Sequence, residues 1–297
     1  MLQQKKPKTG ARKPDWLRRR LGTGPAYEKV RDLVNSSRLH TVCQEANCPN
    51  IWECFSRGTS TFLIMGPNCT RACRFCAVGH GPIHPPDPHE PVRVADAVAR
   101  LGLKYVVITS VTRDDLPDGG ARVFAETIRE IQKRVAGAAV EVLIPDFQGD
   151  RDALRVVMDA RPAVLNHNLE TVPCLYPVVR PEAEYHRSLD ILRWAREQDP
   201  RIPTKSGLML GLGESDKEVE ETLRDLLDAG CSILTLGQYL QPSKEHLPVE
   251  RYIHPEEFDN WRKRALDMGF SEAASGPFVR SSYHAEALYQ PTNPLYS

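Results

Sequence analysis

The sequence predicts an α/β fold, specifically a partial (βα)6 TIM-like barrel, on three observations. The chain has 297 residues, 41% of them hydrophobic, which suffices for one large domain with a full core. Apolar runs typical of strands alternate with helical patterns six times. The runs have the pattern of parallel strands buried on both faces, with Tyr105 to Thr109 as a continuous apolar example, and right-handed crossovers then curl the sheet. Because six units are fewer than the eight of a closed barrel, we expect an open barrel with N- and C-terminal extensions covering its open face.

The chain begins with a basic segment. Residues 1–24 contain eight Lys and Arg residues, and Asp15 is their only acidic residue. We interpret this segment as a flexible arm, either a solubilising tail or an element that steers an acidic partner. Over the whole chain Lys plus Arg and Asp plus Glu are both 39, which gives no argument for a nucleic-acid partner.

Membrane insertion and secretion are not expected. No apolar run approaches the roughly 18 residues that a membrane span needs, and the start of the chain has no apolar signal core. We therefore expect a cytoplasmic protein without a membrane partner, with an organelle matrix as the alternative because the start is basic.

Three further regions follow the arm: an N-terminal extension at 25–59, the barrel at 60–240 and a C-terminal extension at 241–297. A short amphipathic helix is expected near Tyr27 to Val34. The predicted strands are 60–65, 105–109, 140–144, 163–166, 205–210 and 232–236. Helix boundaries are marked by Gly102, by a capping box of Ser215 with Glu218, and by Pro255 and Gly269 around the last helix.

Three cysteines follow the first predicted strand, in the run Cys69-Thr-Arg-Ala-Cys73-Arg-Phe75-Cys76. A structural zinc site normally has a fourth Cys or His, and electron-carrier ferredoxins also supply four cysteines. Three thiolates leave a four-iron cluster one ligand short, so one iron is kept for a cofactor. Because the loop follows a strand, it falls at the carboxyl ends of the barrel strands, where such folds place their active sites.

A second set of cysteines precedes the barrel. Cys43, Cys48 and Cys54 have the spacing C-x4-C-x5-C, and Pro49-Asn50 provides a turn. Six of the eight cysteines lie between 43 and 76, which fits metal binding in a reducing compartment better than disulfides. The alternative is that all six thiols bind zinc together or are ordinary core cysteines. The separate spacings favour two clusters. For the remaining two, we expect Cys231 to be an inert core thiol and Cys174 to be packed.

The first triad, with its aromatic before the last cysteine, resembles the radical S-adenosylmethionine (SAM) superfamily. Both triads, together with Arg280-Ser-Ser-Tyr283, resemble the lipoyl synthase family over roughly residues 26 to 290. This resemblance implies two [4Fe-4S] clusters and bound SAM. It assigns Cys69, Cys73 and Cys76 to the SAM cluster; Cys43, Cys48, Cys54 and Ser282 to an auxiliary cluster, with Ser281 as the alternative ligand; and Arg280 and Tyr283 to support of substrate or cluster.

The same resemblance implies contacts to SAM. The run Gly207-Leu-Met-Leu-Gly-Leu-Gly-Glu214 resembles the segment that forms the floor under adenine in radical SAM enzymes, and it contains Met209. By this comparison Phe75 lies near the adenine, Ser110 and Thr112 near the methionine amino group, and Asn168 or Glu170 near the ribose.

The chemistry implied by the family is sulfur insertion. Unactivated C–H bonds are not acidic, so a radical is needed, and cofactors carry such chemistry. The resemblance implies that a SAM-derived radical removes hydrogen from carbons six and eight of an octanoyl group on a lipoyl-carrier protein domain. The auxiliary cluster would then donate sulfur, and Ser282, a harder ligand than a thiolate, would release its iron.

Other partners implied by the family are an electron donor such as ferredoxin or flavodoxin and a cluster-assembly or cluster-carrier protein. Two alternative functions compete with this interpretation. An enzyme resembling biotin synthase or a methylthiotransferase would keep the first triad but would not account for the second triad with Arg280 to Tyr283. A zinc module that uses the basic arm to bind nucleic acid would need basic charge over the whole domain.

Overall fold

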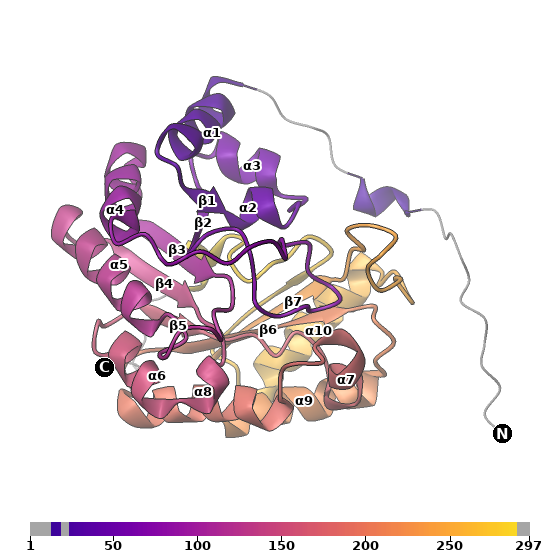
Figure 1. Ribbon diagram of the computed structural model, residues 1–297. Coiled ribbons are helices and arrows are strands. Elements are labelled where there is room, and N and C mark those ends of the chain that lie inside the picture. Colours follow the sequence, from indigo (N-terminus) through magenta and orange to yellow (C-terminus); the bar gives the residue numbers. More distant parts are fainter. Residues whose placement is uncertain (1–12, 19–23, 290–297) are drawn as a thin grey trace.

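The computed structural model describes residues 13–18 and 24–289 (Figure 1). Its centre is an eight-stranded sheet in which the strands lie in chain order. All neighbouring strands from β2 to β8 are parallel, and β1 pairs antiparallel with β2. The strands are β1 (His40–Thr41), β2 (Thr61–Ile64), β3 (Tyr105–Ser110), β4 (Ala139–Leu143), β5 (Val164–Asn166), β6 (Thr204–Leu210), β7 (Ile233–Gln238) and β8 (Glu272–Gly276). The six predicted strands correspond to β2 through β7, so the partial barrel is confirmed.

The larger helices cover the outer face of the sheet, and α1 to α3 form a separate group at one end of it (Figure 1). The α-helices are α1 (Pro25–Ser36), α2 (Val42–Glu45), α3 (Ile51–Ser56), α4 (Glu90–Leu101), α5 (Ala121–Arg134), α6 (Arg151–Met158), α7 (Tyr176–Val179), α8 (Tyr185–Gln198), α9 (Asp216–Asp228) and α10 (Pro255–Met268). Short 3-10 helices are η1 (Asp15–Leu17), η2 (Phe147–Gly149), η3 (Pro173–Leu175) and η4 (Ala285–Leu288).

The predicted helix ends are confirmed. Gly102 and Gly269 follow α4 and α10 with φ of 69° and 119°, a left-handed conformation that favours glycine. Both halves of the capping box between Ser215 and Glu218 are present at the start of α9. Local sequence therefore determined where these helices begin and end.

Two strands were not predicted. β1 has only two residues, and β8 has the sequence Glu-Ala-Ala-Ser-Gly, which lacks the β-branched and aromatic residues favoured in strands. β8 is formed by pairing, because Ile233 through Gly237 of β7 offer a parallel partner to Glu272 through Gly276. This pairing directs the following C-terminal segment to the carboxyl ends of the strands.

The chain ends of the described part pack on the barrel. Leu288 of η4 is buried with Val164 and Ile233, which begin β5 and β7, so η4 packs at the amino-terminal ends of these strands. At the other end of the chain Leu17 is buried, and the Trp16 ring lies 5.0 Å from the His254 ring.

Part of the predicted basic arm is therefore packed against the domain. The rest of the arm, residues 1–12 and 19–23, lies outside the described residues. None of the helices in the described ranges has the length and hydropathy that a membrane span requires.

Candidate functional site

The first cysteine loop follows β2 and is bound to the loop that follows β3. The backbone N–H and the hydroxyl of Thr70 both donate to the Thr112 carbonyl, at 3.1 and 2.9 Å. In return, the backbone N–H of Thr112 donates to Cys69 Sγ at 3.2 Å, and that of Arg71 donates to the same sulfur at 3.5 Å. Hydrogen bonds to ligand sulfurs are a regular feature of iron–sulfur sites, where they help to set the reduction potential of the cluster.

A buried guanidinium fixes the middle of this loop. Arg71 is 5% exposed, and its Nε and a terminal nitrogen donate to Asp114 and Asp146, each at 2.6 Å. Burial by itself raises the pKa of Asp146, but the hydrogen bonds and charge of Arg71 outweigh this and lower it to about 2. The ion pairs therefore tie the cysteine loop to the carboxyl ends of β3 and β4.

The three thiols of this loop lie close enough to influence one another. The pKa of Cys76 is raised to about 12, mainly by burial and to a smaller extent by the charges of Cys73 and Cys69. Burial also raises the pKa of Cys73, with Cys69 adding to the effect and the charge of Arg180 opposing it. The loop thus gathers the three predicted ligands at one place, next to a buried cation.

The second triad forms a similar group beside β1, the edge strand of the sheet. Cys43 lies in α2, Cys48 in the turn that follows, and Cys54 in α3. Burial raises the pKa of Cys43 to about 12, and the charges of Cys48 and Cys54 contribute. Within the described ranges, no three His, Cys, Asp or Glu side chains are arranged to hold a single metal ion. The ligands of a four-iron cluster bind separate irons and stand further apart.

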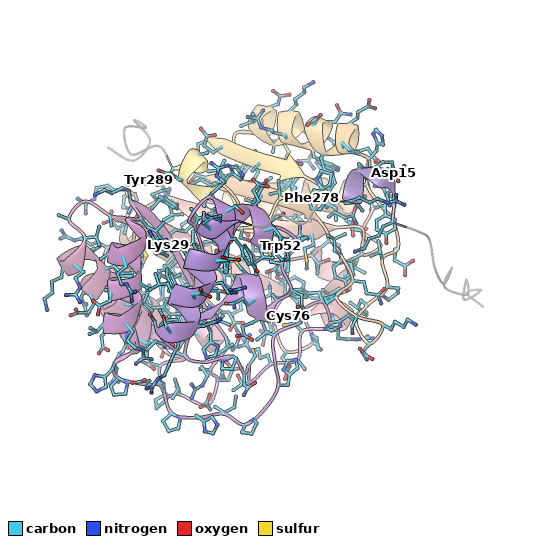
Figure 2. All side chains as sticks on the ribbon, turned by 90° about the horizontal axis from the view of Figure 1, so that it is seen from above. Asp15, Lys29, Trp52, Cys76, Phe278 and Tyr289 are labelled. Atoms are coloured by element: carbon cyan, nitrogen blue, oxygen red, sulfur yellow. The ribbon has the colours of Figure 1, made fainter. Side chains whose placement is uncertain are left out.

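The C-terminal segment lies against this second triad. Asn50 Nδ2 donates to the Phe278 carbonyl at 2.7 Å, and Tyr283 Oη donates to both carboxylate oxygens of Glu53, at 2.9 and 3.0 Å. Figure 2 looks down on α1 to α3, and Trp52 of α3, Phe278 and Cys76 are labelled in it. Through Tyr283, the Arg280 to Tyr283 run is held next to Glu53, which precedes Cys54 of the second triad.

The open end of the barrel contains predicted SAM contacts. Asn168 Nδ2 donates to Glu170 at 2.9 Å and to Ser281 at 2.6 Å. Two buried oxygens, Ser110 Oγ and Asn168 Oδ1, have no hydrogen-bond partner among the described residues. Because buried polar atoms are nearly always satisfied, these oxygens indicate a ligand with donor groups.

Glu170 is held in an unusual conformation at this end. Its φ is 66°, which is uncommon outside glycine. Its backbone N–H donates to the Gly207 carbonyl, and its carbonyl accepts the N–H of Met209 in β6, each at 2.9 Å. Burial raises the pKa of Glu170, although the charge of Arg180 and the hydrogen bond from Asn168 counter part of that rise. Such conformations persist where the surrounding structure enforces them, often at functional sites.

The predicted adenine floor has a defined turn. The Glu214 carboxylate accepts the backbone N–H groups of Gly211 and Leu212, at 2.5 and 2.9 Å. Gly211 has φ of 100°, and a Cβ there would collide with the Arg251 carbonyl. Phe75 and Met209 pack on the same small apolar cluster, which also includes Leu212 and Tyr239. The two side chains expected near adenine are therefore brought together.

Sequence reasoning missed Arg180. This side chain is 9% exposed, and one terminal nitrogen donates to the carbonyls of Asn168 and Leu169, at 2.8 and 3.0 Å. Its Nε has no hydrogen-bond partner, and no carboxylate lies within 4.0 Å of the guanidinium, in the part of the chain that the structure describes. A buried cation of this kind indicates an anionic ligand. Nothing in the local sequence distinguishes Arg180 from a surface arginine.

Other polar residues at this end are used within the protein. Gln238 donates to three carbonyls, Tyr239 Oη donates to the Leu247 carbonyl, and Asp115 pairs with Arg113. Of the two remaining cysteines, Cys231 is buried in the core as predicted. The prediction for Cys174 is wrong. That thiol is exposed and donates to Glu218 at 2.9 Å, because η3 turns it outward to α9.

The sequence model of the radical SAM superfamily matches residues 63–226, and the model of the N-terminal domain of lipoyl synthase matches residues 1–48. The lipoyl synthase of Desulfotalea psychrophila is 58% identical over 287 residues, which are 97% of this chain and 96% of that protein. That of Rubrobacter xylanophilus is 57% identical over 92% of this chain and 85% of its own length. The chain belongs to the lipoyl synthase family.

Membership of this family makes the chain a radical SAM enzyme of the sulfur-inserting type, which uses SAM and [4Fe-4S] clusters and acts on lipoyl-carrier substrates. The family match begins at residue 1, so the basic arm lies inside it; the sequence-based estimate of residues 26 to 290 was too short.

Solved structures confirm the fold. Methylornithine synthase matches with a TM-score of 0.54 at 14% identity, covering 90% of this chain and 83% of that one. The [FeFe]-hydrogenase maturase of Carboxydothermus hydrogenoformans matches with a TM-score of 0.55 at 14% identity, covering 73% and 59%.

Proposed function

We propose that the enzyme inserts two sulfur atoms, at carbons six and eight, into an octanoyl group carried by a lipoyl-carrier protein domain. When bound, SAM and its reduced [4Fe-4S] cluster supply the radical that removes hydrogen from unactivated carbon. The observation that carries the proposal is the convergence of two separate cysteine triads with the Arg280 to Tyr283 segment.

The first cluster would be held by Cys69, Cys73 and Cys76. Their grouping and the two N–H donors to Cys69 fit a thiolate-bound cluster with one iron left for SAM. For SAM, the unsatisfied oxygens of Ser110 and Asn168 support contacts to donor groups, and the buried guanidinium of Arg180 supports binding of the carboxylate. The remaining contacts we propose are Phe75 and Met209 at adenine, Thr112 at the amino group and Glu170 at the ribose.

The auxiliary cluster would be held by Cys43, Cys48, Cys54 and Ser282. Ser281 accepts a hydrogen bond from Asn168 at 2.6 Å, on the barrel side of the segment, whereas Tyr283 is bound to Glu53 beside Cys54. This arrangement supports Ser282 rather than Ser281 as the ligand. Tyr283 and Arg280 would support the cluster and the substrate, since the charge of Arg280 also acts on Glu170.

The remaining proposals concern domains and partners. The extensions at 25–59 and 241–297 would carry the auxiliary site, and the barrel at 60–240 the SAM site. A ferredoxin or flavodoxin would supply electrons, and an assembly or carrier protein would rebuild the auxiliary cluster. The six cysteines of the two triads are all free thiols, and thiols that must bind iron favour a reducing compartment such as the cytoplasm.

Replacing Ser282 by Cys tests the auxiliary site. A thiolate binds iron more tenaciously than a serine oxygen, so Ser282→Cys should keep its iron and its SAM cleavage but insert sulfur at least about tenfold more slowly. Iron content, 5′-deoxyadenosine and lipoyl product are measured on the anaerobically reconstituted enzyme. Ser281→Cys is the matched control and should leave sulfur insertion nearly intact. Full turnover by Ser282→Cys would refute the role of Ser282, and a selective loss in Ser281→Cys would transfer it to Ser281.

A further inference from the structure

The C-terminal segment is held on both sides of the serine pair by contacts that involve no cluster. On one side Asn50, which is 1% exposed, donates to the Phe278 carbonyl at 2.7 Å. On the other side Tyr283 Oη donates to the two oxygens of Glu53, at 2.9 and 3.0 Å. Asn50 and Glu53 lie at the start of α3, the same short helix that carries Cys54.

A second aromatic side chain strengthens the contact to Glu53. His284 Nε2 lies 2.9 Å from Glu53 Oε1, and the rings of Tyr283 and His284 are 4.1 Å apart in an edge-on arrangement. Arg57, one helical turn after Glu53, lies 3.9 Å from its carboxylate and 3.5 Å from the His284 ring. His284 has φ of 53°, a left-handed conformation that turns its side chain back to α3.

We propose that Glu53 is the positioning residue for the serine ligand of the auxiliary cluster. The proposal rests on the function proposed above. Its carboxylate anchors the C-terminal segment to α3, one residue from Cys54, so that the protein itself holds the serine at the cluster. The segment is then docked before the cluster is built and stays docked when the serine releases its iron. The enzyme can accept a new cluster without reorganising its C-terminus.

Two features of the geometry support a positioning role. Glu53 is 34% exposed, and both of its oxygens share the single hydroxyl proton of Tyr283 in a bifurcated hydrogen bond, which sets the direction of the Tyr283 side chain as well as its distance. The anchored residues are 230 positions apart in the chain, so the segment must be retained by tertiary contacts rather than by local structure.

The test compares two glutamates that have similar surroundings. Glu45 lies in α2, is 30% exposed and pairs with His40 at 2.9 Å, but that contact stays within the N-terminal extension. Glu53→Ala and Glu45→Ala are each prepared in the wild-type chain and in a chain whose Cys69, Cys73 and Cys76 are alanine. In the second background the auxiliary cluster is the only one to be measured.

In cluster-free protein, Glu53→Ala should raise the hydrogen-exchange rate of amides in 278–284 by about tenfold, since one to two net hydrogen bonds are lost. After reconstitution, its auxiliary cluster should lose iron several-fold faster to a chelator and show an altered electron paramagnetic resonance spectrum. Glu45→Ala should match the parent in both measurements. Tyr283→Phe keeps the contact of His284 with Glu53, so it should show a smaller effect in the same direction, and the double variant should match Glu53→Ala.

Unchanged exchange in Glu53→Ala would overturn the proposal, as would equal effects of the two alanine variants. Ser282→Ala separates this result from a failure of the proposed ligand. With the anchor intact, Ser282→Ala should keep the slow exchange of 278–284. If the spectrum of the auxiliary cluster is also unchanged in Ser282→Ala, Ser282 is not a ligand of the cluster. The hydrogen-exchange data would then still show that Glu53 anchors the segment.

Discussion

The two cysteine triads are built in different ways. The ligands of the first lie within eight residues on one loop, and hydrogen bonds from Thr70 and Arg71 tie this loop to the neighbouring strand ends. The second is spread over α2 and α3, and its proposed fourth ligand comes from the other end of the chain. One site is thus organised locally on a rigid barrel, and the other depends on two extensions remaining together.

The largest effect expected from this comparison is a division of activities between the triads. Cys69→Ala should abolish both SAM cleavage and product formation. Cys54→Ala should abolish lipoyl product but retain 5′-deoxyadenosine formation, because the SAM site on the barrel is intact. Each variant should retain about four irons per chain. Iron analysis and chromatography of the products measure these outcomes.

Cys231→Ala is the control, since its thiol is buried in the core away from both triads, and it should keep both activities. Lipoyl product from Cys54→Ala would contradict the separation of the two sites.

A smaller effect is expected in the stability of the barrel around the first loop. Asp146 is 1% exposed, so Asp146→Asn leaves the Arg71 guanidinium partly unpaired and should lower the free energy of unfolding by about 3 kcal/mol at neutral pH. The pKa of Asp146 is lowered to about 2, below its ordinary value of 3.8, so its contribution is complete above about pH 4. It is lost as the pH falls from about 4 towards about 2.

Urea unfolding of the cluster-free protein measures this effect at several pH values. The difference in the free energy of unfolding between wild type and Asp146→Asn should shrink as the pH falls. Asp267→Asn, at an exposed site on α10, should have the same free energy of unfolding as wild type. If this difference in free energy stays constant down to pH 2, Asp146 does not stabilise the protein through its charge.

The smallest effect is expected at Arg180. Arg180→Lys keeps the charge but loses the planar fork that binds a carboxylate at two points, so the dissociation constant of SAM should rise about tenfold. Equilibrium binding of SAM to the reconstituted enzyme measures the change, with Arg193→Lys on α8 as control. The auxiliary cluster should be unaffected, which confines the effect to the barrel site. An unchanged dissociation constant for SAM would show that Arg180 does not bind the SAM carboxylate.

Much of this protein could be predicted from local sequence. Six strands, the capping box at Ser215 and the stop at Gly269 follow from residue periodicity and end signals, which act over a few positions. β8 and the exposure of Cys174 could not be predicted in this way. The first depends on an available partner strand, and the second on the direction in which η3 turns.

The sequence by itself determined the fold class and the two cysteine motifs. Helix periodicity and ligand spacing involve residues that are close together in the chain, so they can be recognised without the tertiary structure. Only the tertiary structure decided how Ser281, Glu53 and Arg180 are placed. Their partners come from segments that the order and curvature of the strands bring together. No short-range pattern encodes a contact between residues 230 positions apart, such as that of Glu53 with Tyr283.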